Sequence, residues 1–341
     1  MNLKSKYAIG CHVMFYEIEI LDEYLNSVKK AVEIVQNPEN IIVELFFNIS
    51  EFFEEIDTET TTKKELIKKF NSKCSEMSKL GVLVKSQVYD QNKPYCIADY
   101  RRDFNYKWCN VVDYLVWGES DCLLPREFFH VLEGVKEYAN SQEIYRYTLT
   151  FALRKMWDES WRILEHPEFT DKPYYDMDTE EDTRKALTSP WSIRYTMSQK
   201  EMEEVNKGVD EYDINMLNIP KFDGSGLVIS SDLVRGGVNL PPAVSMVGDD
   251  TSFMAMCQKL MGNDYRQFVI KNILKVHNRN HPNKRLYVKN EDETKSTHFK
   301  RRDNNWYQTI SEMSKGNLNK LFGGQVKFKT YGEFKDEIKK S

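Results

Sequence analysis

The first 135 residues alternate short apolar runs with amphipathic stretches, and this alternation restricts the folds that the chain can form. A short apolar run suits a buried strand, whereas apolar residues spaced three and four apart suit a helix. Strands and helices that alternate at this spacing are typical of βαβ units around a parallel sheet. The expected strands are 7–15, 41–47, 82–89 and 111–117, and the expected helices among them are 21–35 and 61–80.

The rest of the chain is less regular. An acidic stretch at 165–182 predicts an exposed loop or insertion, and the residues from Pro282 onward carry an excess of Lys and Arg on a chain whose net charge is −5. Such a basic tail is either a solvated appendage or a segment that binds a polyanion. The expected elements are helices at 123–138, 249–261 and 306–321 and strands at 222–230 and 269–276.

Several classes of protein are excluded by composition. No apolar run is long enough for a membrane span, and the first residues lack the features of a signal peptide, so we expect a cytoplasmic protein without a transmembrane segment. The six cysteines are scattered and form no CxxC pair, which predicts reduced, mostly buried thiols and no zinc site. The aromatic residues, 18 Phe, 19 Tyr and 6 Trp, are sufficient for a substantial core.

Two acids, Glu119 and Asp121, follow directly on the expected strand 111–117. Parallel sheets bind ligands at the carboxyl ends of their strands. Carboxylates at such a place suit a divalent cation, Mg²⁺ or Mn²⁺, that bridges a diphosphate. The same triplet pattern is common in solvated turns, so its position after the strand is what favours a metal site.

Two further groups could carry chemistry. Asp249 and Asp250 open the expected helix 249–261, where one or both could simply cap the helix and complement its dipole. The functional interpretation is that one of them is a general base. His277 comes directly after the expected strand 269–276, where a histidine is either structural or a metal ligand beside the acids.

The order of these segments resembles that of the GT-A glycosyltransferases, and most of all family 2, which is largely inverting. The resemblance implies an α/β fold of the GT-A (Rossmann-like) type, a mixed sheet with helices on both faces, plus a helical basic C-terminal extension. It implies a nucleotide-sugar-binding half (1–135), an acceptor and catalytic half (136–285) and the extension (286–341). The segments that carry it are 7–28, 111–129 (VVDYLVWGESDCLLPREFF), 222–234 (FDGSGLVISSDLV), 248–262 (GDDTSFMAMCQKLMG) and 275–282 (KVHNRNHP).

The resemblance also implies roles for individual residues. Asp250 matches the catalytic base, and Asp121 and His277 match the metal ligands. Glu119 replaces the first Asp of the family motif, and Asn48 replaces an Asp that often contacts the base, which leaves the base preference open. The implied nucleotide-sugar contacts are Tyr16, Asn48, Arg101, Arg102, Asn105, Glu119, Ser120 and Asp121, and the acceptor side would comprise Trp191, Gly224, Ser225 and Asp249.

The implied reaction is transfer of a sugar from a nucleotide-sugar, with a UDP-sugar favoured, to an acceptor hydroxyl. Mn²⁺ or Mg²⁺ would stabilise the charge that develops on the diphosphate, and Asp250 would take the proton of the attacking hydroxyl. A single displacement of this kind inverts the anomeric configuration.

The acceptor and two rival functions stay open. A glycan or small-molecule acceptor ranks slightly ahead of hydroxylated bases of DNA, which the basic residues 300–302 near Trp306 would suit. A nucleotidyltransferase would normally carry a basic, Gly-rich loop after the first strand, and CHVMFYEIE has neither feature. The other rival is a non-catalytic nucleotide-binding or interaction protein, in which the acids are ordinary surface residues.

Overall fold

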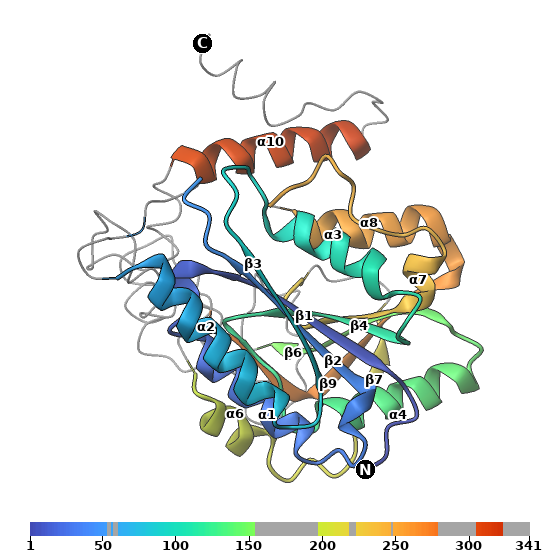
Figure 1. Ribbon diagram of the computed structural model, residues 1–341. Coiled ribbons are helices and arrows are strands. Elements are labelled where there is room, and N and C mark those ends of the chain that lie inside the picture. Colours follow the sequence, from blue (N-terminus) through green and yellow to red (C-terminus); the bar gives the residue numbers. More distant parts are fainter. Residues whose placement is uncertain are drawn as a thin grey trace, which may run out of the picture.

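The computed structural model describes residues 1–52, 56, 61–153, 197–217, 223–246, 248–278 and 305–322 (Figure 1). The strands are β1 (Tyr7–Met14), β2 (Ile41–Asn48), β3 (Leu83–Tyr89), β4 (Tyr114–Glu119), β5 (Cys122–Leu123), β6 (Arg146–Leu153), β7 (Ile214–Met216), β8 (Leu227–Ser230) and β9 (Tyr265–His277). The α-helices are α1 (Leu21–Val32), α2 (Lys63–Ser78), α3 (Ile97–Trp108), α4 (Phe128–Ser141), α6 (Gln199–Asn206), α7 (Ser231–Arg235), α8 (Asp249–Met261) and α10 (Asn305–Phe322).

The strands form one mixed sheet in the order β3-β2-β1-β4-β8-β6-β9-β5, with β7 paired to β9. Strands β3, β2, β1 and β4 are parallel, as the βαβ alternation predicts. Strand β8 runs antiparallel to both β4 and β6, whereas β6 and β9 are parallel. The mixed α/β sheet that we expected is therefore confirmed.

Helices cover both faces of this sheet, and each face has its own apolar core. Alternate residues of β1 point to opposite sides, so Ile9 joins the cluster under α1, α2 and α4, whereas Ala8 joins the cluster under α3, α7 and α8. Phe47 stacks on Phe70 of α2 in the first cluster, and Trp117 contacts Phe253 of α8 edge-to-face in the second. Each side chain of this kind contributes about 1.5–3 kcal/mol when fully buried.

Some elements differ from expectation for identifiable reasons. Helix α3 was not predicted, because its buried face includes the polar Arg101 and Asn105 beside Ala98 and Phe104, which interrupts the apolar stripe. The strand expected at 111–117 begins only at Tyr114, since the amides of Val111 and Val112 still bond to Trp108 at the end of α3. Strand β6 and the first residues of β9 were also missed.

Helix α10 confirms the helix expected at 306–321. Figure 1 shows it lying across the top of the view, above α3 and α8. Ile310 is buried in the larger apolar cluster, Leu318 packs on the smaller one, and the Asn317 amide donates to the Ala243 carbonyl. The described part of the basic extension is thus packed against the body.

The part of the chain that the structure describes contains no helix that combines the length and the apolar character needed to cross a membrane.

Candidate metal and catalytic site

Three elements bring the predicted metal ligands together. Strand β4 ends at Glu119, the chain turns through Ser120 and Asp121, and the short strand β5 pairs antiparallel with β9. In this pairing Cys122 lies opposite His277, so His277 comes next to the turn. The backbone amide of Asn278 donates a 2.6 Å hydrogen bond to the Asp121 carbonyl and closes the arrangement.

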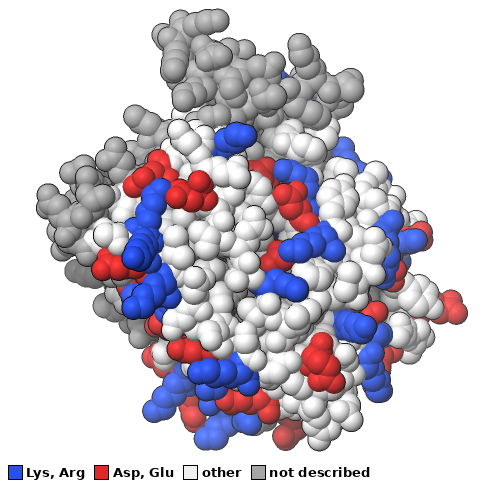
Figure 2. Space-filling view, in the orientation of Figure 1, with Lys and Arg blue, Asp and Glu red and all other residues white. Residues whose placement is uncertain are grey.

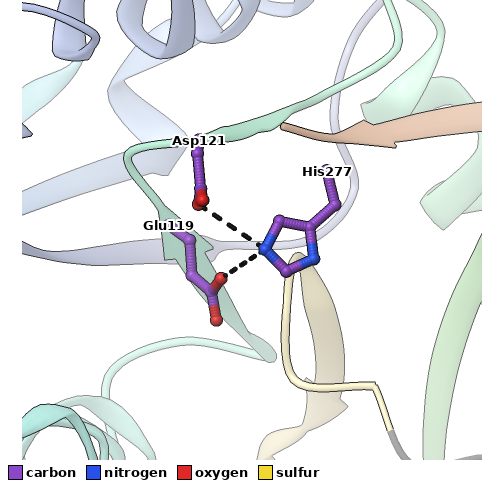
Figure 3. A group of neighbouring side chains, drawn as sticks. All are labelled: Glu119, Asp121 and His277. Carbon is purple, nitrogen blue, oxygen red and sulfur yellow. Dashed lines mark ion pairs between the residues drawn. The ribbon is translucent and has the colours of Figure 1, made fainter. Parts of the chain in front are cut away.

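The three side chains point toward one another (Figure 3). His277 Nε2 lies 3.1 Å from Glu119 Oε2 and 3.6 Å from Asp121 Oδ1. One potential ligand atom from each residue lies within 4.8 Å of the others. Asp121 and His277 are almost buried, and one fifth of the Glu119 side chain is exposed.

This donor set fits a divalent cation. Carboxylate oxygens are the preferred ligands of Mg²⁺, and a mixture of carboxylate and imidazole ligands is acceptable to Mn²⁺. His277 presents Nε2 to both acids, and its buried Nδ1 has no hydrogen-bond partner among the described residues. The predicted ligands Asp121 and His277, with Glu119 as a third, are therefore adjacent.

The charge on Glu119 is stabilised by its neighbours. Burial alone would raise the pKa of this carboxyl, but the Arg101 guanidinium and the contact with His277 hold the pKa well below its ordinary value. Arg101 Nη2 donates a 2.5 Å hydrogen bond to Glu119 Oε1. Glu119 thus remains a carboxylate, the form that a cation requires.

Arg101 joins this group to the second predicted constellation. Its Nη1 donates to Asp249 Oδ2 at the start of α8, and its Nη2 also donates to the Gly224 carbonyl at 3.0 Å. The guanidinium lies 4.7 Å from the centre of the Trp117 ring. Arg101 is only 3% exposed, so the diphosphate contact that we predicted for it would require a change of these internal bonds.

Asp250 follows Asp249 in the first turn of α8 and is partly buried. Its burial and the adjacent negative charge of Asp249 raise the pKa of Asp250 to about 7, although its bond from the Thr251 amide acts in the opposite direction. That amide donates to Asp250 Oδ1 at 2.7 Å. A carboxyl with this pKa can accept a proton near neutral pH.

The turn at Asp223–Gly226 lies next to the Arg101 guanidinium. Lys275 of β9 is fully buried and pairs with Asp223 at 2.9 Å, and it also donates to the Ser225 carbonyl. Ser225 is itself buried and donates from Oγ to Asp223 Oδ1 at 3.0 Å. A Cβ atom on Gly224 would lie 2.7 Å from Arg101 Nη1, so a larger residue there would force the guanidinium to move.

Lys275 and Asp223 are site-shaping residues that the sequence reasoning missed. A lysine inside the apolar run of β9, ILKVH, is a signal for a buried ion pair, since an unpaired buried ammonium is very costly. The identity of its partner depends on the tertiary structure.

Several predicted nucleotide contacts are internal in this structure. Asn48 is fully buried, and its amide nitrogen bonds to the Tyr95 carbonyl at 2.9 Å. Asn105 accepts from the Trp117 indole and donates to Asn239. Tyr16 is 1% exposed and its ring packs against Phe15. A ligand could reach these side chains only after local rearrangement.

The two remaining predicted nucleotide contacts, Arg102 and Ser120, have different surroundings. Arg102, the next residue of α3, has partners different from those of Arg101: it donates to the Pro241 carbonyl and to Asp99. Ser120 is buried in the turn between Glu119 and Asp121. Of the predicted acceptor residues, Gly224 and Asp249 both bond to Arg101, and Ser225 is next to Gly224. Trp191 lies outside the described residues, as do 165–182 and 300–302.

Comparisons with known proteins give structural matches only. No protein-family model and no curated protein matches the chain. Residues 1–349 of S. aureus TarS match with a TM-score of 0.43 and 11% identity over 93% of this chain and 72% of that chain. A UDP-glucose pyrophosphorylase complexed with UDP-glucose matches with a TM-score of 0.34 and 9% identity over 78% of this chain and 90% of that one.

The described structure defines the fold class independently of these matches. The strands β3, β2, β1 and β4 are adjacent and parallel, β8 lies antiparallel between β4 and β6, and helices cover both faces of the sheet. A mixed α/β sheet with helices on both faces is the fold class that the sequence resemblance implied.

Proposed function

We propose that this chain is a metal-dependent glycosyltransferase that moves a sugar from a nucleotide-sugar to an acceptor hydroxyl with inversion. The observation that carries the proposal is the juxtaposition of two groups. One consists of Glu119, Asp121 and His277 within 4.8 Å of one another, and the other is the Asp249–Asp250 pair, which Arg101 connects to Glu119. The first group, called the metal group below, offers ligands for a cation. It lies beside a carboxyl with a pKa of about 7, and this combination suits the reaction.

Each residue has a defined task in this proposal. Asp121 and His277, with Glu119 beside them, would hold Mn²⁺ or Mg²⁺, and a bound cation would supply stabilisation of the charge that develops on the diphosphate. Asp250 Oδ2 accepts the proton of the acceptor hydroxyl while that oxygen attacks the anomeric carbon. The bond between the anomeric carbon and the diphosphate oxygen breaks in the same step, and the nucleoside diphosphate leaves. The turn at Gly224 and Ser225 forms the acceptor wall, and nucleotide contacts come from the first half of the chain, 1–135.

Among the described residues of the site, Asp250 is the carboxyl suited to be a base, and this supports a direct displacement. Inversion needs one carboxylate on the acceptor side and no nucleophile on the sugar's opposite face. Asp249 is unsuited to act as a nucleophile, because its carboxylate is bound by the Arg101 guanidinium.

The division of the chain into a donor half (1–135) and an acceptor half (136–285) is part of this proposal.

The acceptor is a glycan or small molecule in preference to DNA. On the face shown in Figure 2, the basic side chains of the described residues lie in several clusters, each with acidic side chains beside it. Binding to a phosphate backbone relies on a basic patch without such acidic neighbours. A UDP-sugar is the first donor to test, because the resemblance in the sequence favours it.

The test is a thermal-shift screen of UDP, GDP, CDP and their sugars, each with and without Mn²⁺. We expect one nucleotide-sugar to raise the melting temperature only when Mn²⁺ is present. Incubation of that donor with acceptor mixtures should then release the nucleoside diphosphate and yield a product of inverted configuration. Release of pyrophosphate from a nucleoside triphosphate and a sugar phosphate would indicate a nucleotidyltransferase instead, and the absence of any Mn²⁺-dependent ligand would contradict the proposal.

A further inference from the structure

The buried side chain of Arg101 contacts several different groups of the protein. Its two terminal nitrogens bond to Glu119, Asp249 and the Gly224 carbonyl, and its plane lies over the Trp117 ring. These partners belong to β4, to the turn before β8 and to α8. Arg101 itself is on α3, so one side chain connects four segments that are distant in sequence.

The electrostatic position of Arg101 is equally specific. The metal group and the α8 acids are both negative, and Arg101 lies between them with one acid of each group bound to it. The arginine remains charged, because the neighbouring carboxylates more than offset the effect of burial and raise its pKa. A guanidinium can bridge two carboxylates in this way, whereas an ammonium presents a single point charge.

Gly224 supports the same geometry from the acceptor side. An added Cβ would lie 2.7 Å from Arg101 Nη1 and 3.3 Å from Asp250 Cβ. Gly224 therefore lies in contact distance of both the bridge and the proposed base, and the bridge depends on the absence of a side chain there.

We propose that Arg101 is a positioning residue that couples the metal group to the segment bearing the base, by holding Glu119 and Asp249 in one ion-pair bridge. It rests on the proposed function of this site. It assigns Arg101 a role inside the protein in place of the diphosphate contact. The bridge sets the orientation of the first turn of α8 relative to the metal ligands, and it removes part of the negative charge of Glu119 that a cation would otherwise feel.

The two effects predict opposite changes in one variant. In Arg101→Gln the metal group loses a neighbouring positive charge, so Mn²⁺ alone should bind about tenfold more tightly. The first turn of α8 loses its anchor, so kcat should fall about 100-fold while the KM for the donor changes little. If Arg101 only supported the fold, Arg101→Gln would lower the Mn²⁺ affinity as well as kcat.

Two further variants separate charge from geometry. Arg101→Lys keeps the charge but cannot span both carboxylates, so Mn²⁺ affinity should remain near that of the wild type while kcat falls. Gly224→Ala keeps every charge and displaces the guanidinium, so we again expect a Mn²⁺ affinity near that of the wild type and a lower kcat. If Arg101→Gln does not fold, because two carboxylates are left without their cation, these two variants still test the bridge.

The matched control is Lys107→Gln, on the same helix. It removes a cation paired with Glu44, away from the site, and should leave Mn²⁺ affinity and kcat unchanged. The measurements are a Mn²⁺ titration of the full chain by calorimetry and steady-state kinetics with the donor found by the screen. A wild-type chain that binds no Mn²⁺ overturns the metal site and this inference with it. Wild-type binding together with unchanged Mn²⁺ affinity and kcat in Arg101→Gln overturns the inference alone.

Discussion

Replacing Asp250 by Asn should make the protein more stable at alkaline pH while it abolishes turnover. The substitution is nearly isosteric, and the amide oxygen of Asn can still accept the 2.7 Å hydrogen bond from the Thr251 amide. What it removes is a negative charge that lies partly buried beside Asp249. The two effects have a common origin, since the raised pKa that suits a base also makes its ionisation unfavourable in the folded state.

The magnitude follows from the pKa of this carboxyl. The ordinary pKa of Asp is 3.8, and in the folded chain the pKa of Asp250 is about 7. Between these values the unfolded chain loses the proton and the folded chain keeps it, so the stability of the wild type falls as the pH rises. The loss is nearly complete by pH 8, where the carboxyl is ionised in both states. Linkage gives about 2 kcal/mol of this loss between pH 5.5 and pH 8.

The assay compares melting temperatures of the wild type and Asp250→Asn across that range, in EDTA and without donor. For a chain of this length 2 kcal/mol corresponds to about 3 °C, so the advantage of the variant should grow by about 3 °C from pH 5.5 to pH 8. Asp264→Asn, which removes a mostly exposed carboxylate, controls for the change in net charge. A difference between variant and wild type that stays constant with pH would refute the raised pKa, and near-normal turnover of Asp250→Asn would exclude it as the base.

Three further predictions concern the same site. Turnover of the wild type should rise with pH and reach half its maximum near pH 7, because Asp250 must be ionised to accept a proton; a rate that falls over this range in a pH–rate profile would contradict this. Asp121→Ala and His277→Ala should each weaken Mn²⁺ binding by at least about tenfold in a calorimetric titration, and unchanged binding would place the cation elsewhere. Lys275→Met should lower the free energy of unfolding in urea by about 3–5 kcal/mol, because it leaves Asp223 buried without its cation, and a loss below about 1 kcal/mol would show that the pair is dispensable.

The elements with a regular pattern could be predicted because local sequence determines them. The apolar runs at β1 and β2 and the amphipathic pattern of α1 agree with the structure to within a few residues. Helix α8 was predicted with its observed bounds, since Gly248 and the two acids mark its start. Helix α3 was missed for a physical reason, because Arg101 and Asn105 occupy its buried face and find their partners only in other segments.

The amino-acid sequence by itself determined which residue types stand at the ends of the strands and helices: Glu119 and Asp121 after β4, the two acids at the start of α8, and His277 at the end of β9. Only the tertiary structure decided that these residues meet. The pairing of β5 with β9 places His277 opposite Cys122, and the Arg101 bridge connects Glu119 to Asp249. Strand register and long-range ion pairs depend on which surfaces pack against each other, and that information is spread over the whole chain, whereas a strand or a helix cap is encoded within a few neighbouring residues.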